Sequence, residues 1–172
     1  KIAYRENSDG VIALLVPHKN TLESISLSSK PFIIVLEAIE KPGNLGAVLR
    51  TADAASADAV IVCDPLADLY NPNVIRSSIG CIFTVPVAVA TSQEAFQWLK
   101  KNNIAVYAAE LGSSDWYQNT DFTASSAIVM GTEAKGLTNF WLENSDKRIK
   151  IPMRGKIDSL NVSVSTAVLT FE

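Results

Sequence analysis

Short, strongly apolar runs recur along most of this chain, separated by stretches with helical spacing or by polar loops. Several runs, such as PFIIVLEAI at residues 31–39, are apolar at consecutive positions, which is typical of strands buried on both faces. Strands that alternate with helices form a parallel sheet with helices on both faces. We therefore predict an α/β fold with a mostly parallel sheet. Its strands are expected at residues 31–39, 58–63, 82–90, 104–109, 126–131 and 147–152, and its helices at 44–56, 72–79, 92–102 and 139–143.

Residues 1–30 fit this alternation less well. VIALLVP at residues 11–17 is expected to be an extra strand at an edge of the sheet, and residues 1–10 a linker. Two of the helices have predicted caps, Asn44 and Ser92, because such side chains accept hydrogen bonds from the first turn. The chain begins at Lys1 rather than methionine and ends at Glu172 in a helical pattern. We therefore expect a fragment whose last helix continues further.

The stretch SLNVSVST at residues 159–166 is ambiguous. Its alternation of polar and apolar side chains indicates a half-buried strand, but the overlapping run TAVLTFE could equally be helical. Buried hydroxyl and amide groups cost free energy unless each has a hydrogen-bond partner. These polar side chains must therefore pair with the protein's own backbone or serve a ligand.

Composition excludes several functional classes. No apolar run reaches the roughly 18 residues that a membrane span needs, so we expect no membrane partner. One histidine cannot build a histidine-based metal site, and Cys63 and Cys81, each within an apolar run, suit buried thiols in a reducing cytosol. The net charge of −3 argues against nucleic acid, although residues 147–156 carry five basic side chains and no acidic one. A solvated surface would also explain that run.

Polar or glycine-bearing loops follow several of the predicted strands. In open α/β sheets, ligands bind beyond the carboxyl ends of the strands. The sequence therefore favours one site, assembled from the loops KPGN (41–44), AELGSSD (109–115), GTEAKG (131–136) and PMRGKIDSLN (152–161). The glycine fingerprint of dinucleotide-binding folds is absent.

Each candidate residue has a plain structural alternative. Arg50 has small neighbours, so it could lie along its helix and meet a phosphate at the helix N-terminus, or it could simply pair with Asp53 on a solvated face. Gly131 and Glu133 could bring a ligand close to the backbone, or form an ordinary turn. The segment around Ile151 and Met153 could bind a flat heterocycle or could pack into the core.

Three blocks of the sequence, in order, resemble the SpoU (TrmH-like) family of RNA 2′-O-ribose methyltransferases, in the SPOUT superfamily. They are KPGNLGAVLRTADAA, IVMGTEAKGLT and IKIPMRGKIDSLNVSVSTAV, and the stretch ADLYNPNVIRSSIGCIFTVPV between the first two is also similar to a family segment. The likeness covers residues 31–172. Ser56 departs from the glycine that the family often has after the first helix, which concerns helix termination rather than chemistry.

The resemblance implies a C-terminal trefoil knot, which general topology rules would not predict. It also implies S-adenosyl-L-methionine as cofactor and transfer of its methyl group to a ribose 2′-hydroxyl. Carried over by position, the cofactor would contact Ala109, Glu110, Gly131, Ile151, Met153 and Leu160. The catalytic residues would be Arg50, Asn44, Glu133, Ser159 and Asn161, and Arg50, Arg76, Arg154 and Lys156 would bind RNA.

The same resemblance implies a cytoplasmic homodimer that needs no metal. Residues 1–30 would then be a linker after a missing N-terminal RNA-binding domain, and residues 31–172 the knotted catalytic domain. Ribosomal RNA is the preferred substrate, with tRNA as the alternative. Three other possibilities remain: a catalytically silent RNA-binding relative, a knotted transferase acting on a base nitrogen, and a nucleotide-dependent oxidoreductase, which the absent glycine fingerprint disfavours.

Overall fold

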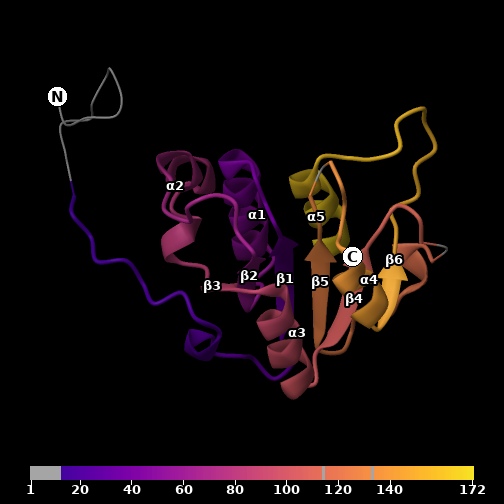
Figure 1. Ribbon diagram of the computed structural model, residues 1–172, viewed down its shortest axis with the longest axis horizontal. Helices are drawn as coiled ribbons and strands as arrows, with labels where there is room; N and C mark the ends of the chain where they lie inside the picture. The colour runs from indigo at the N-terminus through magenta and orange to yellow at the C-terminus, as the bar shows by residue number, and fades with distance from the viewer. Residues whose placement is uncertain (1–12, 114, 133) are drawn as a thin grey trace.

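The computed structural model describes residues 13–113, 115–132 and 134–172. In this part of the chain, six parallel strands form one sheet in the order β3-β2-β1-β5-β4-β6 (Figure 1). The strands are β1 (Phe32–Glu37), β2 (Ala59–Cys63), β3 (Val87–Ala90), β4 (Ala105–Ala109), β5 (Ser126–Met130) and β6 (Lys147–Ile149). The helices are α1 (Pro42–Ala54), α2 (Pro72–Ser78), α3 (Ser92–Lys101), α4 (Asn139–Asn144) and α5 (Val162–Thr170). The predicted α/β fold with a parallel sheet is confirmed.

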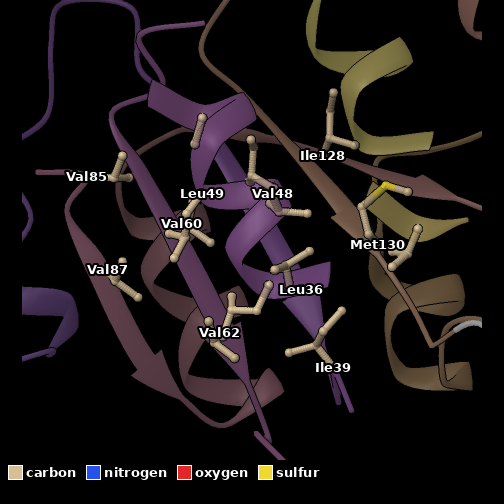
Figure 2. Packing of buried hydrophobic residues seen from close by; sticks show 14 of the residues in the cluster. Leu36, Ile39, Val48, Leu49, Val60, Val62, Val85, Val87, Ile128 and Met130 are labelled. Atoms are coloured by element: carbon tan, nitrogen blue, oxygen red, sulfur yellow. The ribbon is translucent and has the colours of Figure 1, made fainter. Parts of the chain in front are cut away.

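The central strands are buried on both faces because apolar side chains stand at consecutive positions. In β1, Ile34 and Leu36 belong to one hydrophobic cluster, whereas Ile33 and Val35 belong to another. The first cluster contains residues of α1, α2 and α5, and part of it is drawn in Figure 2. The second contains residues of α3 and α4. Helices therefore cover both faces of the sheet, as predicted.

Cys63, the last residue of β2, is a buried thiol. Its side chain is buried, and burial together with the nearby carboxylates of Asp64 and Glu37 raises the pKa of the thiol. The thiol therefore stays neutral and unreactive, which agrees with the predicted buried cysteine. Cys81 is only partly buried.

Two predicted strands differ from the structure. The strand expected at 82–90 begins only at Val87, because residues 81–83 form a 3₁₀ turn that follows left-handed backbone at Ile79 and Gly80. The expected edge strand at 11–17 is wrong for residues 13–17, which pair with no strand and are exposed; residues 11 and 12, like the predicted linker 1–10, lie outside the described residues. The sheet edge at β3 instead meets the carbonyl of Asn20, which accepts from the Val89 amide at 2.9 Å.

Both predicted helix caps are also wrong. Helix α1 begins at Pro42, since proline is favoured in a first turn, so Asn44 lies inside the helix rather than at its cap. Helix α3 is capped by Thr91, which forms a capping box with Glu94. Ser92 is thereby free for a different hydrogen bond. Ser56 stands where the family often has glycine, and its left-handed φ of 54° agrees with a role in helix termination, since such a φ usually favours glycine.

The C-terminal segment returns from the sheet edge to its centre. After β6 at the edge, residues 151–161 form neither helix nor strand and arch over the carboxyl ends of the strands (Figure 1). Asn161 then caps α5, whose residues Val162 and Leu169 pack in the cluster that holds α1 and β5. The alternation at 159–166 was therefore a misleading strand signal, because residues 162–170 are helical.

Asp146, just before β6, connects α3 with β4. Its carboxylate accepts from Lys100 Nζ and from the Val106 amide, both at 2.8 Å. Partial burial raises the pKa of this carboxyl, but the two hydrogen bonds and the Lys100 charge outweigh burial and hold the pKa below its ordinary value of 3.8. A lowered folded-state pKa contributes stability above the unfolded value, and the contribution disappears as the pH falls through the folded value.

We therefore expect Asp146→Asn to destabilise the fold at pH 7 by about 1 kcal/mol or less, because the pair is largely solvent-screened. Urea unfolding of both proteins should show this difference shrinking once the pH drops below the ordinary carboxyl value of 3.8. A difference of the same size at pH 7 and pH 3 would show that the carboxylate charge plays no part.

Candidate active site

A cavity of about 550 Å³ opens beyond the carboxyl ends of β4, β5 and β6. The chain after each of these strands forms part of its wall, and α5 with the preceding loop closes the remaining side. All six residues predicted to contact a cofactor line this one cavity: Ala109, Glu110, Gly131, Ile151, Met153 and Leu160. The structure thus brings together residues from the segments that follow β4, β5 and β6, and their binding role stays a prediction.

The wall that follows β5 is a closed loop of residues 131–137. The amide of Thr132 donates to the carbonyl of Gly136 at 3.1 Å, and the reverse bond measures 3.0 Å. A Cβ at Gly131 would lie 2.2 Å from the Gly136 carbonyl carbon, and Gly136 has a φ of +68°. Both glycines are therefore required for the loop to close, which agrees with the turn alternative, and the approach of a ligand to this backbone stays a prediction. Glu133, predicted as catalytic, lies outside the described residues.

The wall that follows β6 is anchored at its first residue. The Lys150 amide donates to the Asp115 carbonyl at 2.9 Å, and the Lys150 carbonyl accepts from the Tyr117 amide at 3.0 Å. Ile151 and Met153 follow immediately, are half-buried and line the cavity, and Ile151 also packs against the core. Packing into the core, one of the two alternatives weighed for this segment, is therefore observed for Ile151, and binding of a flat heterocycle stays a prediction.

Polar groups also line the cavity. Ser159 lines it and donates to the Asp158 carboxylate at 3.2 Å. Glu110 lines it from the β4 side and accepts from Arg148 Nη1 at 3.5 Å. The cavity therefore combines apolar side chains with a few charged or hydroxyl groups, the usual composition of a small-molecule site.

Asn44 and Asn161, both predicted as catalytic, are joined directly. Asn161 Oδ1 accepts from the Ser163 amide at 2.9 Å and so caps α5, while Nδ2 donates to Asn44 Oδ1 at 3.2 Å. The network thus fixes the orientation of the Asn161 amide. Residues 117 positions apart meet because α5 packs against α1.

Arg50 lies on α1 and is exposed to solvent. The alternative of a surface pair is not borne out: among the described residues, Arg50 forms no ion pair with Asp53, whose carboxylate instead accepts from Thr84 Oγ1 at 3.2 Å. A Cβ at Gly43, two turns earlier on the same helix, would meet nothing within 4 Å. The face of α1 at Gly43 is therefore open.

A sequence profile of the SpoU rRNA Methylase family matches residues 31–171. The chain belongs to this family. It is 35% identical over 139 residues to the 23S rRNA (guanosine(2553)-2′-O)-methyltransferase RlmP of Bacillus subtilis, covering 81% of this chain and 56% of that protein. It therefore spans little more than half the length of that curated relative.

Solved structures of the SpoU family share the fold. A structure titled RNA 2′-O ribose methyltransferase is 42% identical with a TM-score of 0.82, covering 90% of this chain and 59% of that one. The SpoU methyltransferase AviRb from Streptomyces viridochromogenes, in complex with the cofactor AdoMet, is 28% identical with a TM-score of 0.85, covering 90% and 63%. The predicted family resemblance is confirmed.

The first SpoU block contains a glycine whose role could not be assigned from the sequence. A Cβ at Gly46 would lie 1.9 Å from Ser77 Oγ and 2.7 Å from the Ser78 amide nitrogen. Gly46 is therefore required where α1 crosses α2. The serines of the Arg-Ser-Ser segment pack here, so this segment serves the packing of α2 against α1.

The predicted RNA-binding residues lie on different elements. Arg76 is exposed in the last turn of α2 and donates to Asn73 Oδ1. Arg154 and Lys156 are exposed in the arch of residues 151–161. Positive charge is thus available beside the cavity and on the helix that packs against α1.

Several residues around the cavity were not singled out from the sequence. These residues are Leu111, Gly112, Lys135, Leu137, Asp158, Val162, Ser165 and Leu169. The sequence signal that could have found them was their position in loops that follow strands, or on the helix after SLN.

In the described residues, no helix has the length and apolarity to cross a bilayer, and no three His, Cys, Asp or Glu side chains gather as a metal site would require.

Proposed function

We propose that this chain is the catalytic part of an S-adenosyl-L-methionine-dependent methyltransferase that modifies a ribose 2′-hydroxyl in ribosomal RNA. The observation that carries the proposal is one cavity lined by residues of the second and third SpoU blocks, with the Asn44–Asn161 hydrogen bond joining the first block to the third. Family membership supports it, as do the names of RlmP and of the AdoMet complex of AviRb.

The residues of the cavity fit the proposed cofactor. Its volume of about 550 Å³ is in the usual range for small-molecule sites. Ile151, Met153 and Leu160 supply apolar surface for an adenine ring, and backbone at Ala109 and Gly131 lies at strand ends, where amide and carbonyl groups become available. The Glu110 carboxylate is a suitable acceptor for hydroxyl or ammonium groups.

When bound, the cofactor supplies an electrophilic methyl group on a sulfonium, with a neutral thioether as the leaving group. The protein must orient the 2′-hydroxyl in line and help its poorly acidic proton to pass to solvent water. Arginine is effectively always protonated, so Arg50 is no base. Arg50 instead clamps an RNA phosphate and stabilises the negative charge that develops on the oxygen. Asn44, Asn161, Ser159 and Glu133 position the nucleotide and the cofactor.

The remaining parts of the proposal concern assembly. The arch of 151–161 and the return of α5 to the sheet centre support a trefoil knot, in which the C-terminal segment passes through the preceding loops. We further propose a cytoplasmic homodimer in which Arg50, Arg76, Arg154 and Lys156 bind RNA, and a linker in residues 1–30 that follows an RNA-binding domain.

Calorimetric titration of S-adenosylmethionine and S-adenosylhomocysteine, followed by transfer of a labelled methyl group to 23S rRNA and tRNA transcripts, tests the proposal. We expect saturable binding of both cofactors, and label in rRNA dinucleotides that resist alkaline cleavage. Label in tRNA alone would support the tRNA alternative. Binding without transfer would indicate a silent relative, and no heat from folded protein would refute a working cofactor pocket.

A further inference from the structure

We propose that Glu37 is a positioning residue for the cavity: its buried carboxylate fixes the end of the 131–137 loop and so keeps that wall in its binding shape. Glu37 is the last residue of β1, does not line the cavity, and belongs to none of the three SpoU blocks. The inference rests on the proposed function only for the identity of the ligand that the cavity binds.

Both carboxylate oxygens of Glu37 are used by one residue. Glu37 Oε2 accepts from the Thr138 amide at 2.8 Å, and Oε1 accepts from Thr138 Oγ1 at 2.7 Å. The Ser92 hydroxyl lies 3.3 Å from Oε1. Hydrogen bonds to an ionised acceptor are roughly twice as strong as neutral ones. Thr138 is therefore held at two points, which fixes its orientation as well as its position.

Glu37 is only 3% exposed, yet within the described residues it forms no ion pair with lysine or arginine. A buried carboxylate is costly unless its oxygens are well bonded, and an apolar residue would pack at the end of a buried strand at less cost. The role of the carboxylate is thus to accept the two hydrogen bonds that Thr138 donates. This arrangement points to a specific geometric role rather than to general stability.

The missing side-chain cap of α4 supports the same conclusion. Thr138 is the N-cap residue of α4, where threonine normally accepts a hydrogen bond from the first helical turn. No such side-chain cap bond forms here, and the hydroxyl instead donates to Glu37. Helix α4 thus lacks a side-chain cap bond from Thr138, and the same side chain holds the end of the preceding loop against Glu37.

Strand β1 determines where both ends of the loop lie. Leu36 pairs with Met130, the residue before the loop, and Glu37, next along β1, binds Thr138, the residue after it. Six residues between these two anchors line the cavity: Gly131, Thr132, Ala134, Lys135, Gly136 and Leu137. With both ends fixed to one strand, the loop can present a rigid backbone to a ligand.

The test compares Glu37→Gln with Asp64→Asn, a matched control, since Asp64 accepts from the Ser92 hydroxyl at 2.7 Å but does not contact Thr138. Glutamine keeps the volume of Glu37 but turns one acceptor into a donor facing Thr138. Without ligand, we expect hydrogen exchange in Glu37→Gln to speed up at residues 131–138, while the sheet amides stay protected. S-adenosylhomocysteine should bind about tenfold more weakly, a change of roughly 1.4 kcal/mol.

The Thr138 variants keep the test decisive even if Glu37→Gln does not fold. Thr138→Ser retains both donors and should bind S-adenosylhomocysteine as the wild type does, whereas Thr138→Val should lose part of the affinity. Unchanged loop exchange, or a uniform rise over the whole sheet, would overturn the inference, as would equal binding by Thr138→Val and wild type. If the wild type binds no S-adenosylhomocysteine, the proposed function fails, but loop exchange still decides the role of Glu37.

Discussion

Replacing Arg50 with lysine is expected to lower the rate of methyl transfer to RNA by about a hundredfold, the usual loss when one donor to a developing oxyanion is removed. Lysine keeps the charge but not the planar fork of donors that can hold a phosphate and a hydroxyl oxygen together. Arg50 does not line the cofactor cavity, so S-adenosylhomocysteine affinity should stay within about twofold, since no cofactor contact is lost.

The measurement is single-turnover transfer of a labelled methyl group, together with calorimetry on the same preparation. Asp53→Asn is the matched control, because Asp53 lies on the same helix, is likewise exposed and forms no ion pair with Arg50 among the described residues. We expect this control to transfer methyl groups at the wild-type rate. Full turnover by Arg50→Lys would show that a point charge is sufficient and that the bidentate clamp is wrong.

Leu160→Arg is expected to weaken S-adenosylhomocysteine binding by about a hundredfold or more, because it replaces apolar contact surface for the ligand with a strongly hydrated charge. Leu160 is half-buried and faces the cavity immediately before the Asn161 cap of α5. The longer, charged side chain would fill space that the proposed cofactor needs. Calorimetry on the folded variant measures the loss.

Ile157→Arg is the matched control for this variant. Ile157 belongs to the same arch, is 64% exposed and does not line the cavity, so the same change of chemistry should leave cofactor affinity unchanged. Equal loss in both variants would indicate that added charge disturbs the arch as a whole. Normal binding by Leu160→Arg would place the cofactor elsewhere.

The apolar runs were sufficient to predict most of the sheet, because strands buried on both faces leave a continuous hydrophobic signal. PFIIVLEAI and SAIVMG became neighbouring central strands, β1 and β5. The signal failed at 82–90, where residues 81–83 form a 3₁₀ turn instead of the start of a strand. It failed again at 159–166, because hydroxyl groups can satisfy themselves within a helix, as Thr166 does by donating to the Val162 carbonyl at 2.7 Å.

The cavity lining followed from the resemblance, since spacing alone could not choose between a ligand site and an ordinary turn. Neither the residue spacing nor the family resemblance could predict which side chains of different helices are in contact. The close contact of Gly46 with Ser77 and the bond between Asn44 and Asn161 depend on how helices cross, which local sequence does not encode. Glu37 gave one usable signal, an acidic residue at the end of an apolar strand.

The central place of β1 has a consequence for how the chain folds. Ile33 pairs with Ala59 on one side and with Ala127 on the other, so the second partner becomes available only after most of the chain between them has been synthesised. Sheets built from such distant pairings form slowly, because the loop must close before the contacts form. Until β5 arrives, β1 presents an open apolar edge that can pair with other chains. We therefore expect nascent chains that end before Ser126 to aggregate or to bind chaperones, and release to follow synthesis of β5.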